Sequence, residues 1–246
     1  MNMDDVALAR FLAQEAGRIL MDLRAAGMHE GKALGAQGDV LANAFLMEAL
    51  AQHRPDDGVL SEETADTPAR LSKERVWIID PLDGTREYGE GRADWAVHVG
   101  LSVGGKAALG AVALPGLDLV LDSAAPPALP PMAPVPRLLV SRSRPAREAV
   151  TVAQVLGGEL VPMGSAGAKA MAVVRGEAEI YLHSGGQYEW DNCAPVAVAA
   201  GAGLHVSRID GSPLVYNNAD TWLPDLLICR PQWAQRVLEE VARIGN

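Results

Sequence analysis

Hydrophobic and polar residues alternate along the chain with two different periods, which predicts a mixture of helices and strands. Apolar residues recur at helical spacing over residues 4–26 and again over about 39–53, so both segments are predicted to be amphipathic helices. Between them, residues 31–38 are rich in glycine and are predicted to form a flexible surface loop, with an active-site flap as the alternative. The chain is therefore expected to begin with two helices joined by a glycine-rich connection.

Shorter apolar runs after the second helix predict strands. Residues 59–60 and 76–79 are each expected to form a strand. Three further runs, separated by Gly104-Gly105 and by Pro115-Gly116, have the pattern of an antiparallel meander. Its strands are predicted over residues 95–103, 106–114 and 117–121. The N-terminal helices are therefore expected to accompany an antiparallel-rich sheet.

Six prolines between Ala125 and Arg137 interrupt every regular pattern, and we expect a domain boundary there. Beyond them strands and helices are predicted to alternate. The strands are expected over residues 138–140, 159–161, 178–182 and 226–229, and the helices over 145–156, 166–175, 192–202 and 232–244. The sequence thus predicts an α/β protein with an N-terminal α+β domain (residues 1–124), a proline-rich linker (125–137) and a smaller C-terminal α/β domain (138–246).

Composition excludes some classes of function. About half of the 246 residues are apolar, and the formal net charge of −10 argues against a nucleic-acid binder, which needs a basic face. The two cysteines, Cys193 and Cys229, lie far apart and are expected to be core thiols in a reducing cytoplasm. No apolar run approaches about eighteen residues and no basic-then-apolar leader is visible, so we expect a cytoplasmic protein without a membrane partner.

The candidate chemistry centres on the segment Asp80-Pro81-Leu82-Asp83-Gly84-Thr85, which follows the strand predicted over residues 76–79. Pro81 is expected to end that strand in a turn, and Gly84 to permit a backbone angle or a close approach to a ligand. Two carboxylates this close repel each other unless a cation lies between them, and hard oxygen ligands suit Mg²⁺ or Mn²⁺. The segment therefore predicts a divalent cation site at a sheet edge.

A second acidic pair follows the strand predicted over residues 59–60. It lies in Ser61-Glu62-Glu63, shortly before the first motif. Two neighbouring strands that both end in carboxylates can converge on one metal centre, whereas a solvated loop with surface glutamates is the alternative.

Three separated segments together resemble the lithium-sensitive, magnesium-dependent inositol monophosphatase superfamily of phosphatases. These are Ser61-Glu62-Glu63, the segment from Asp80 to Thr85, and Trp190-Asp191 at the start of a predicted helix. Three further segments are more similar to its adenosine 3′,5′-bisphosphate nucleotidase branch than to its inositol branch: Arg86-Glu87-Tyr88, Ser141-Arg142-Ser143 and Gly164-Ser165-Ala166.

The resemblance implies a layered sugar-phosphatase fold and a cytoplasmic enzyme. The enzyme would remove the 3′-phosphate of adenosine 3′,5′-bisphosphate, a by-product of sulfate activation, and of its sulfated form. The resemblance also implies that two Mg²⁺ ions, with Mn²⁺ as a substitute, are held by five residues: Glu62, Asp80, the backbone carbonyl of Leu82, Asp83 and Asp191. Lithium inhibition is a further implication.

The implied catalytic residues are Glu62, Asp83 and Thr85. Glu62 and Thr85 would orient the attacking water, while Gly84 and Thr85 would offer backbone N–H groups to the phosphate. One position departs from the family pattern, because Val40 and Asn43 stand where a Thr-x-x-Asp is usual. This departure leaves a weak third metal in doubt, although Asp39 lies one turn away.

The chemistry suits these residue types. Phosphate monoesters resist attack by water, and two bound metals can activate the water and stabilise the leaving oxygen. A bisphosphate also needs a second cationic seat, for which Arg142 and Lys169 are candidates, with Arg86 behind them. A solvated surface cation is the alternative for each of the three. Substrate contacts are predicted from Glu62, Leu82, Asp83, Gly84, Thr85, Ser141, Arg142, Ser165, Lys169 and Asp191.

Several alternatives stay open. Ser165 could bond a ribose or cap a loop, and Trp190 is expected to be a packing wedge rather than a base-stacking platform. The five histidines show no ligand spacing and are expected to be structural or exposed. Inositol 1-phosphate and fructose 1,6-bisphosphate are alternative substrates, and a catalytically silent metal-binding homologue is an alternative class. The expected partner is a small phosphorylated molecule, and a homodimer stays open.

Overall fold

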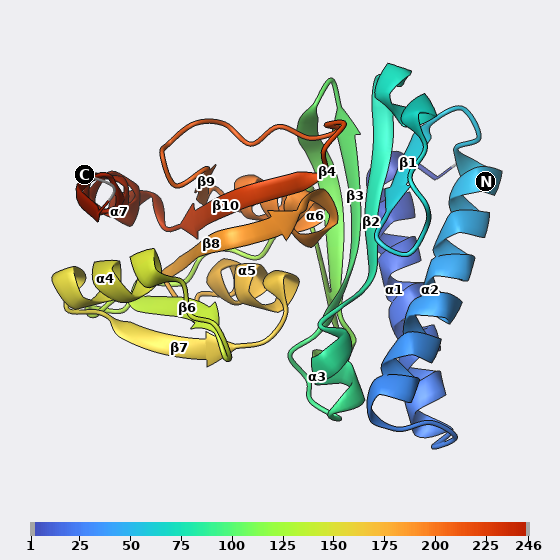
Figure 1. Ribbon diagram of the computed structural model, residues 1–246, viewed down its shortest axis with the longest axis horizontal. Coiled ribbons are helices and arrows are strands. Elements are labelled where there is room, and N and C mark those ends of the chain that lie inside the picture. The colour runs from blue at the N-terminus through green and yellow to red at the C-terminus, as the bar shows by residue number, and fades with distance from the viewer. Residues whose placement is uncertain (1–2, 245–246) are drawn as a thin grey trace.

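Two five-stranded sheets organise the protein, as a computed structural model of residues 3–244 shows (Figure 1). The first sheet has the strand order β1-β2-β3-β4-β5, and the second has the order β7-β6-β8-β10-β9. Helices lie outside each sheet and between the two. The predicted layered α/β architecture is confirmed.

The first sheet contains β1 (Gly58–Ser61), β2 (Arg75–Asp83), β3 (Ala96–Val103), β4 (Lys106–Leu114) and β5 (Leu119–Asp122). Only β1 and β2 are parallel, so the predicted antiparallel meander is confirmed. Helices α1 (Asp5–Ala25) and α2 (Gly31–His53) cover its outer face and bury the largest apolar cluster of this half (Figure 1). Two 3₁₀ turns, Pro68–Ser72 and Pro115–Leu117, and the short α3 (Thr85–Gly89) complete this part.

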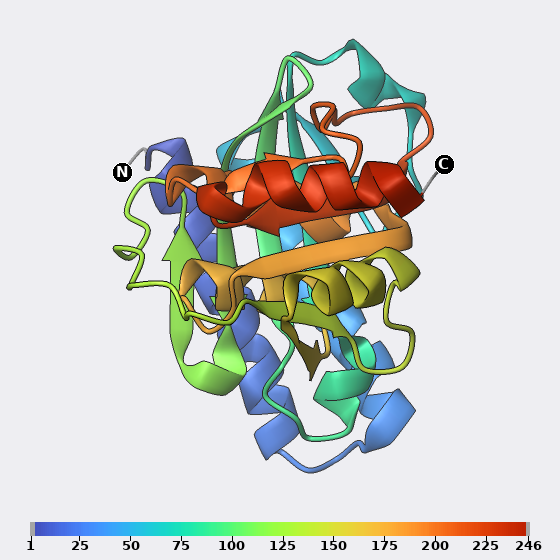
Figure 2. The same ribbon diagram turned by 90° about the vertical axis from the view of Figure 1, so that its left-hand side faces the viewer.

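The second sheet contains β6 (Arg137–Ser141), β7 (Glu159–Met163), β8 (Ile180–Tyr188), β9 (His205–Ser207) and β10 (Trp222–Cys229). Helices α4 (Arg147–Leu156) and α7 (Pro231–Ile244) cover its outer face, which is turned to the viewer in Figure 2. Helices α5 (Ala166–Val174) and α6 (Glu189–Gly201) are sandwiched between the sheets. Because α6 packs on β3 and β4, residues from both halves meet in one interior layer.

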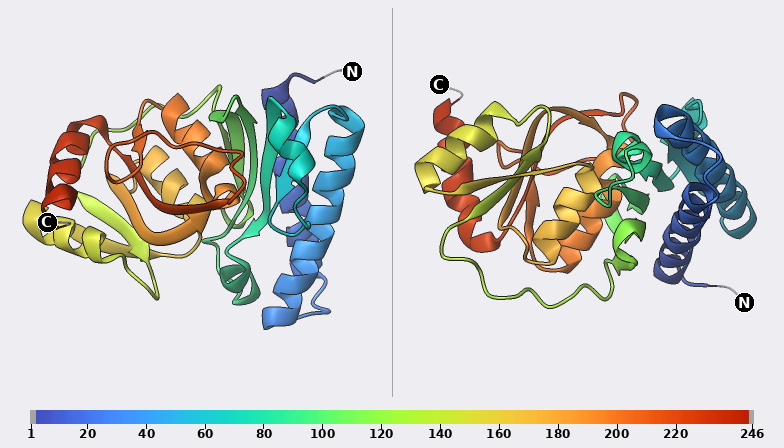
Figure 3. Two further views of the ribbon diagram at one scale, coloured as in Figure 1. Left: turned by 45° about the horizontal axis from the view of Figure 1, so that its top comes forward. Right: turned by 90° about the horizontal axis from the view of Figure 1, so that it is seen from below.

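The proline-rich segment joins the two sheets along the outside of the molecule (Figure 3). Within the described chain, residues 123–136 form no helix or strand. The boundaries at residues 124 and 137 stay a prediction, because a shared helical layer does not show whether the two halves fold separately.

The glycine-rich segment 31–38 is helical, so the predicted surface loop is wrong. A β-carbon added at Gly35 would lie 2.6 Å from Cγ2 of Thr85, and one at Gly38 would lie 2.9 Å from Cδ2 of Leu20. The missing side chains let α2 approach α1 and the β2–α3 connection, and this packing outweighs the poor helix propensity of glycine. On the same helix, the side chain of Leu41 is exposed to solvent.

Pro81 does not end its strand, which is a second correction. Strand β2 continues to Asp83, and its pairing with β3 shifts register between Asp80 and Asp83. A bulge tolerates proline because the strand is not fully paired there. Elsewhere β8, α6 and β10 extend beyond the predicted limits, and the short β9 was not predicted.

The prediction that both cysteines are core thiols is confirmed, because Cys193 and Cys229 are buried and form no disulfide. Among residues 3–244 none of the helices has the length and apolarity needed to span a membrane.

Replacing Gly35 by alanine tests the close contact between α2 and Thr85. Helix propensity alone would make Gly35→Ala stabilising by about 1 kcal/mol. The added methyl group instead meets Thr85 in a filled space, so we expect a net loss of about 1–3 kcal/mol in the free energy of unfolding. Denaturant unfolding measures the effect. The exposed neighbour Ala36 serves as the control. The variant Ala36→Gly measures the effect of helix propensity alone, at a position where the side chain is exposed to solvent.

Candidate active site

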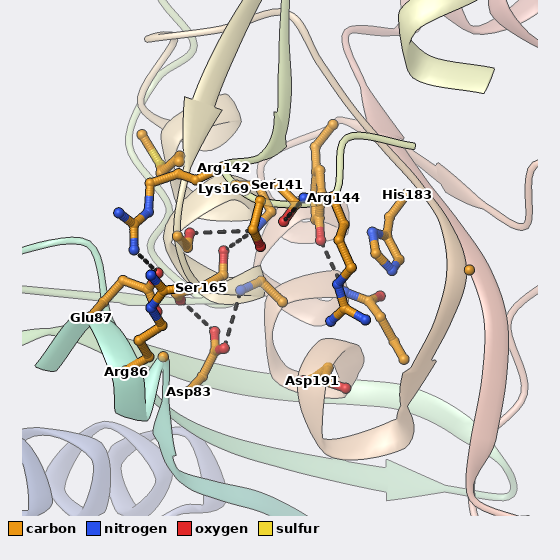
Figure 4. A pocket seen from close by; sticks show the side chains of 18 of the residues that line it. Asp83, Arg86, Glu87, Ser141, Arg142, Arg144, Ser165, Lys169, His183 and Asp191 are labelled. Carbon is orange, nitrogen blue, oxygen red and sulfur yellow. Dashed lines mark hydrogen bonds and ion pairs between the residues drawn. The ribbon is translucent and has the colours of Figure 1, made fainter. Parts of the chain in front are cut away.

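Three carboxylates gather where β2 and the start of α6 meet. One oxygen each from Asp80, Asp83 and Asp191 lies within 4.8 Å of the others. Asp80 and Asp83 come from the end of β2, while Asp191 lies in the first turn of α6. Asp83 and Asp191 line a pocket of about 590 Å³ that opens between the two sheets (Figure 4), whereas Asp80 is buried and does not line it. The predicted convergence of distant acidic segments is therefore present for these three residues.

Asp83 is the most strongly held member of the cluster. Its Oδ2 accepts hydrogen bonds from the Ser165 hydroxyl and from the Gly167 N–H at 2.6 Å, and its Oδ1 accepts one from the Ala166 N–H at 3.1 Å. These donors form the first turn of α5, where free N–H groups favour an anion. Burial works to raise the pKa of Asp83, but His98 and the α5 donors outweigh it and lower the pKa to about 2.

His98 lies directly behind Asp83 and was not predicted to have a role at the site. The ring is fully buried on β3, with Nε2 at 3.2 Å from Asp83 Oδ2 and Nδ1 at 2.9 Å from the Trp190 carbonyl oxygen. It thus bridges the end of β2 and the residue that precedes Asp191. Burial acts to lower the pKa of His98, but the contact with Asp83 prevails and raises it. A single histidine without ligand spacing gave no signal of this contact.

The other carboxylates lack such compensation. Burial and the negative charge of Glu62 raise the pKa of Asp80 well above its ordinary value. Burial and the charge of Asp83 raise the pKa of Asp191 to about 6. Glu62 keeps contact with solvent, yet the protein atoms crowded around its carboxyl and the charge of Asp191 raise its pKa to about 7. Burial is the largest cause of each of these pKa shifts and neighbouring carboxylates add to it, while His98 and Lys169 oppose the rise only in part at Asp191.

This donor set fits a divalent cation. It consists of carboxylate oxygens, the hard ligands that Mg²⁺ and Mn²⁺ prefer, and it carries more negative charge than His98 offsets. Glu62 is not among the three mutually close residues, but it follows β1, which runs parallel to β2, and its carboxyl interacts with Asp80. Leu82 is buried, and its backbone carbonyl accepts the Thr85 hydroxyl at 3.2 Å.

Gly84 and Thr85 form the turn into α3. Gly84 has a φ of +91°, and a β-carbon there would lie 3.2 Å from the β-carbons of both Ser165 and Trp95. This explains the glycine, because a side chain would be strained and crowded. Thr85 is the first residue of α3, as expected from its position after the motif.

Asn43 and Asp39 differ in what they contact. The Asn43 amide donates to Thr64 Oγ1 at 3.0 Å and accepts from the Ser61 hydroxyl at 2.7 Å, so it fixes the loop after β1. Asp39 instead faces the acidic edge: burial and the charge of Glu63 raise its pKa to about 7. The acidic residue of α2 nearest to this edge is therefore Asp39.

The candidate cations of the pocket are placed unequally. Lys169 is buried, so its alternative as a surface cation is wrong; its Nζ donates to the carbonyls of Gly164 and Ser165. Arg142 pairs with Glu87 of α3 and with Glu90, which follows that helix. Arg86 forms an exposed ion pair with Glu90 at 2.8 Å, in line with the alternative of a surface cation, and it also lines the pocket.

Arg144 was not predicted as a site residue. It lines the pocket beside Ser141 and Arg142 (Figure 4), and no described carboxylate pairs with it. Arg144 directly follows the segment Ser141-Arg142-Ser143, and this position next to a predicted substrate segment was the only signal in the sequence.

The predicted residues therefore divide into those at the pocket and those beside it. Asp83, Gly84, Ser141, Arg142, Ser165, Lys169 and Asp191 line the pocket. Glu62, Asp80, Leu82 and Thr85 lie behind or beside its wall, next to the cluster in space or sequence. Ser165 caps α5, accepting the Ala168 N–H at 3.0 Å, so the capping alternative is present, and the contact with a ribose stays a prediction. Trp190 is half-buried and stacks on Tyr188.

Known proteins resemble the chain over most of its length. The model of the inositol monophosphatase family matches residues 3–125 and 135–245. A 3′-phosphoadenosine 5′-phosphate phosphatase of Mycobacterium bovis is 47% identical over 242 residues, covering 93% of this chain and 90% of that protein. The 3′(2′),5′-bisphosphate nucleotidase CysQ of Escherichia coli K12 is 32% identical over 199 residues, covering 75% of this chain and 80% of the relative.

Solved structures resemble it in fold. An inositol monophosphatase from Anabaena sp. PCC 7120 superimposes with a TM-score of 0.80 over 97% of this chain and 95% of that one, at 21% identity. At this identity the likeness concerns the arrangement of elements and not the substrate.

The acidic cluster should make the metal-free protein less stable as the pH rises from about 5.5 to 8. Asp191 and Glu62 have ordinary pKa values of 3.8 and 4.5, which folding raises to about 6 and about 7. Folded protein binds these two protons more tightly than unfolded protein does, which stabilises the fold. This stabilisation is complete when the pH is below the ordinary pKa values, and it is lost as the pH rises through the raised pKa values. The melting temperature in EDTA should fall by several degrees, at about 2–4 °C per kcal/mol.

Two comparisons control this experiment. Asp191→Asn removes one titrating group, so its melting temperature should depend less on pH. Added Mg²⁺ should raise the melting temperature of the unaltered protein more at pH 8 than at pH 5.5, because cations compete with protons for the carboxylates. A Mg²⁺ effect that is independent of pH would contradict the assignment of these groups as ligands.

Proposed function

This chain belongs to the inositol monophosphatase family and is a phosphatase, and we propose that its substrate is adenosine 3′,5′-bisphosphate. In this proposal it removes the 3′-phosphate in a Mg²⁺-dependent reaction, acts in the cytoplasm, and clears a by-product of sulfate assimilation. The sulfated nucleotide is a further proposed substrate. The observation that carries the proposal is the cluster of Asp80, Asp83 and Asp191 within 4.8 Å at the edge of a nucleotide-sized pocket.

The proposed metal ligands are Glu62, Asp80, the carbonyl of Leu82, Asp83 and Asp191. When bound there, divalent cations would lower the pKa of a water molecule and neutralise phosphoryl oxygens. Mn²⁺ is a proposed substitute for Mg²⁺, and the position of Asp39 beside Glu63 keeps a third, weaker ion within the proposal.

The chain's own groups would position the reactants. Glu62 and Thr85 would hold the attacking water, with the Glu62 carboxylate accepting a hydrogen bond from that water. The Thr85 hydroxyl is held in position because it donates a hydrogen bond to the Leu82 carbonyl. The N–H groups of Gly84, which precedes α3, and of Thr85, its first residue, would bind the phosphate. Asp83 needs no reorganisation for its part, because α5 and His98 already fix its carboxylate.

The rest of the substrate would contact Ser141, Arg142, Ser165 and Lys169. Of these, Lys169 supplies a buried positive charge beneath the pocket, and Ser165 already bonds Asp83. A second phosphate near Arg142 would compete with Glu87 and Glu90 for its guanidinium. No described carboxylate forms an ion pair with Arg144, so we propose this guanidinium as an additional binding group for the second phosphate.

A phosphate-release panel tests the substrate. Adenosine 3′,5′-bisphosphate, inositol 1-phosphate and fructose 1,6-bisphosphate are each supplied with and without Mg²⁺. We expect the nucleotide to have the highest kcat/KM, activity to disappear in EDTA, and Li⁺ to inhibit. Hydrolysis of inositol 1-phosphate with no action on the nucleotide would overturn the proposed substrate while leaving the family intact.

Replacing Asp83 by asparagine tests the metal site. Asp83→Asn preserves shape but removes a ligand charge, so turnover should fall by roughly 10²–10³-fold or more. The matched control is Asp122→Asn, which alters a buried carboxylate of β5 that pairs with Arg10 outside the cluster. Melting temperatures show whether both variants fold. Near-normal turnover in a folded Asp83→Asn protein would remove the two-metal assignment and favour a mechanism that does not depend on this carboxylate.

A further inference from the structure

The wall of the pocket formed by the second sheet carries two exposed aromatic rings. Trp222 begins β10 and pairs directly with Tyr188, the last residue of β8, in the antiparallel ladder. Residues opposite each other in such a ladder project from the same face of the sheet. The rings are 47% and 46% exposed, although both are large and apolar, and both line the pocket that also contains Asp83 and Asp191.

Each ring is supported from behind. Gly186 has a φ of +97°, and a β-carbon there would lie 2.4 Å from Nε1 of Trp222, so the indole edge rests against a backbone that only glycine allows. The Tyr188 ring stacks on Trp190 with centroids 4.8 Å apart and planes 10° from parallel. Supported rings lose little freedom when a ligand covers their open faces, which favours binding.

Most of the other residues that line the pocket are polar, and the lining residues Met163 and Tyr181 are less exposed than these two rings. Its other walls include Arg142, Arg144, Lys169 and the acidic residues, all suited to phosphate or to cations. A ligand that satisfied both regions would need anionic groups and a flat apolar surface in one molecule. The pocket volume of about 590 Å³ lies within the roughly 300–1,000 Å³ of small-molecule sites and exceeds what a lone phosphate requires.

We propose that Trp222, together with Tyr188, is the stacking platform for the purine base of the nucleotide substrate. The platform rests on the proposed function, because the carboxylate cluster must hold the phosphate that reacts. Trp190, next to Asp191, acts as a support for Tyr188 and does not touch the base. Trp222 is therefore a specificity-determining residue: it binds the base and takes no part in the chemistry.

The test compares Trp222→Ala with Trp222→Phe on two substrates. Stacking on an aromatic ring changes base binding by about 5- to 150-fold. We expect Trp222→Ala to raise KM for adenosine 3′,5′-bisphosphate by that factor with less than about a twofold change in kcat. The conservative Trp222→Phe should keep most of the affinity. A base-free phosphate, fructose 1,6-bisphosphate, should show the same KM in all three proteins.

Two results would overturn the platform. One is an unchanged KM for the nucleotide in Trp222→Ala. The other is an equal rise of KM for both substrates, which would mean that the indole only shapes the pocket or the β8–β10 pairing. Melting temperatures of the variants separate that outcome from loss of the fold.

Failure of the proposed function is distinguishable from failure of the platform. If the unaltered protein releases no phosphate from the nucleotide, the proposed substrate is wrong. Calorimetric titration with adenosine 5′-phosphate and with ribose 5-phosphate still decides the platform. We expect the unaltered protein to bind adenosine 5′-phosphate more tightly than ribose 5-phosphate, and Trp222→Ala to bind the two ligands equally. Equal binding of the two ligands by the unaltered protein would overturn the platform.

Discussion

The carboxylate of Asp83 is the point at which the two sheets of the molecule become one site. Asp83 belongs to β2 of the first sheet, but its oxygens accept the first N–H groups of α5, which lies against the second half of the chain. His98 closes the same contact from β3 and also bonds the backbone just before Asp191. If this carboxylate were displaced, the acidic cluster, the start of α5 and the pocket wall would lose the hydrogen bonds that hold them together.

Charge explains why the fold needs such a contact. A chain with a net charge of −10 must hold several carboxylates close together and still admit an anionic phosphate. The structure concentrates positive charge behind the cluster: His98 touches Asp83, and Lys169 is buried beneath Gly164 and Ser165. These two groups offset only part of the negative charge. Burial, together with the neighbouring carboxylates, raises the pKa values of Asp80 and Asp191, and a divalent cation can balance the negative charge of this cluster.

Sequence patterns predicted most of the elements, because helices and strands have local periodic signals. The convergence of Asp191 with Asp80 and Asp83 was implied by the family resemblance and not by any local pattern. Sequence patterns did not predict contacts that only the assembled layers create. The segment 31–38 contains glycines that signal flexibility in isolation, yet packing against Thr85 makes it helical. His98 lies within an ordinary strand pattern, and nothing in that pattern indicates which side chain it will face.

The two halves of the chain contribute different kinds of residue to the site. Glu62, Asp80 and Asp83 come from adjacent strand ends of the first sheet, where the ladder between β1 and β2 fixes their spacing. Arg142 and Arg144 follow β6, and Trp222 begins β10, so the residues that we propose as contacts for the rest of the substrate lie at strand ends and loops of the second sheet. Loops accept substitution more readily than paired strands. Substrate choice can therefore change in this architecture while the acidic cluster stays in place, which explains how one fold is shared with inositol monophosphatases at 21% identity.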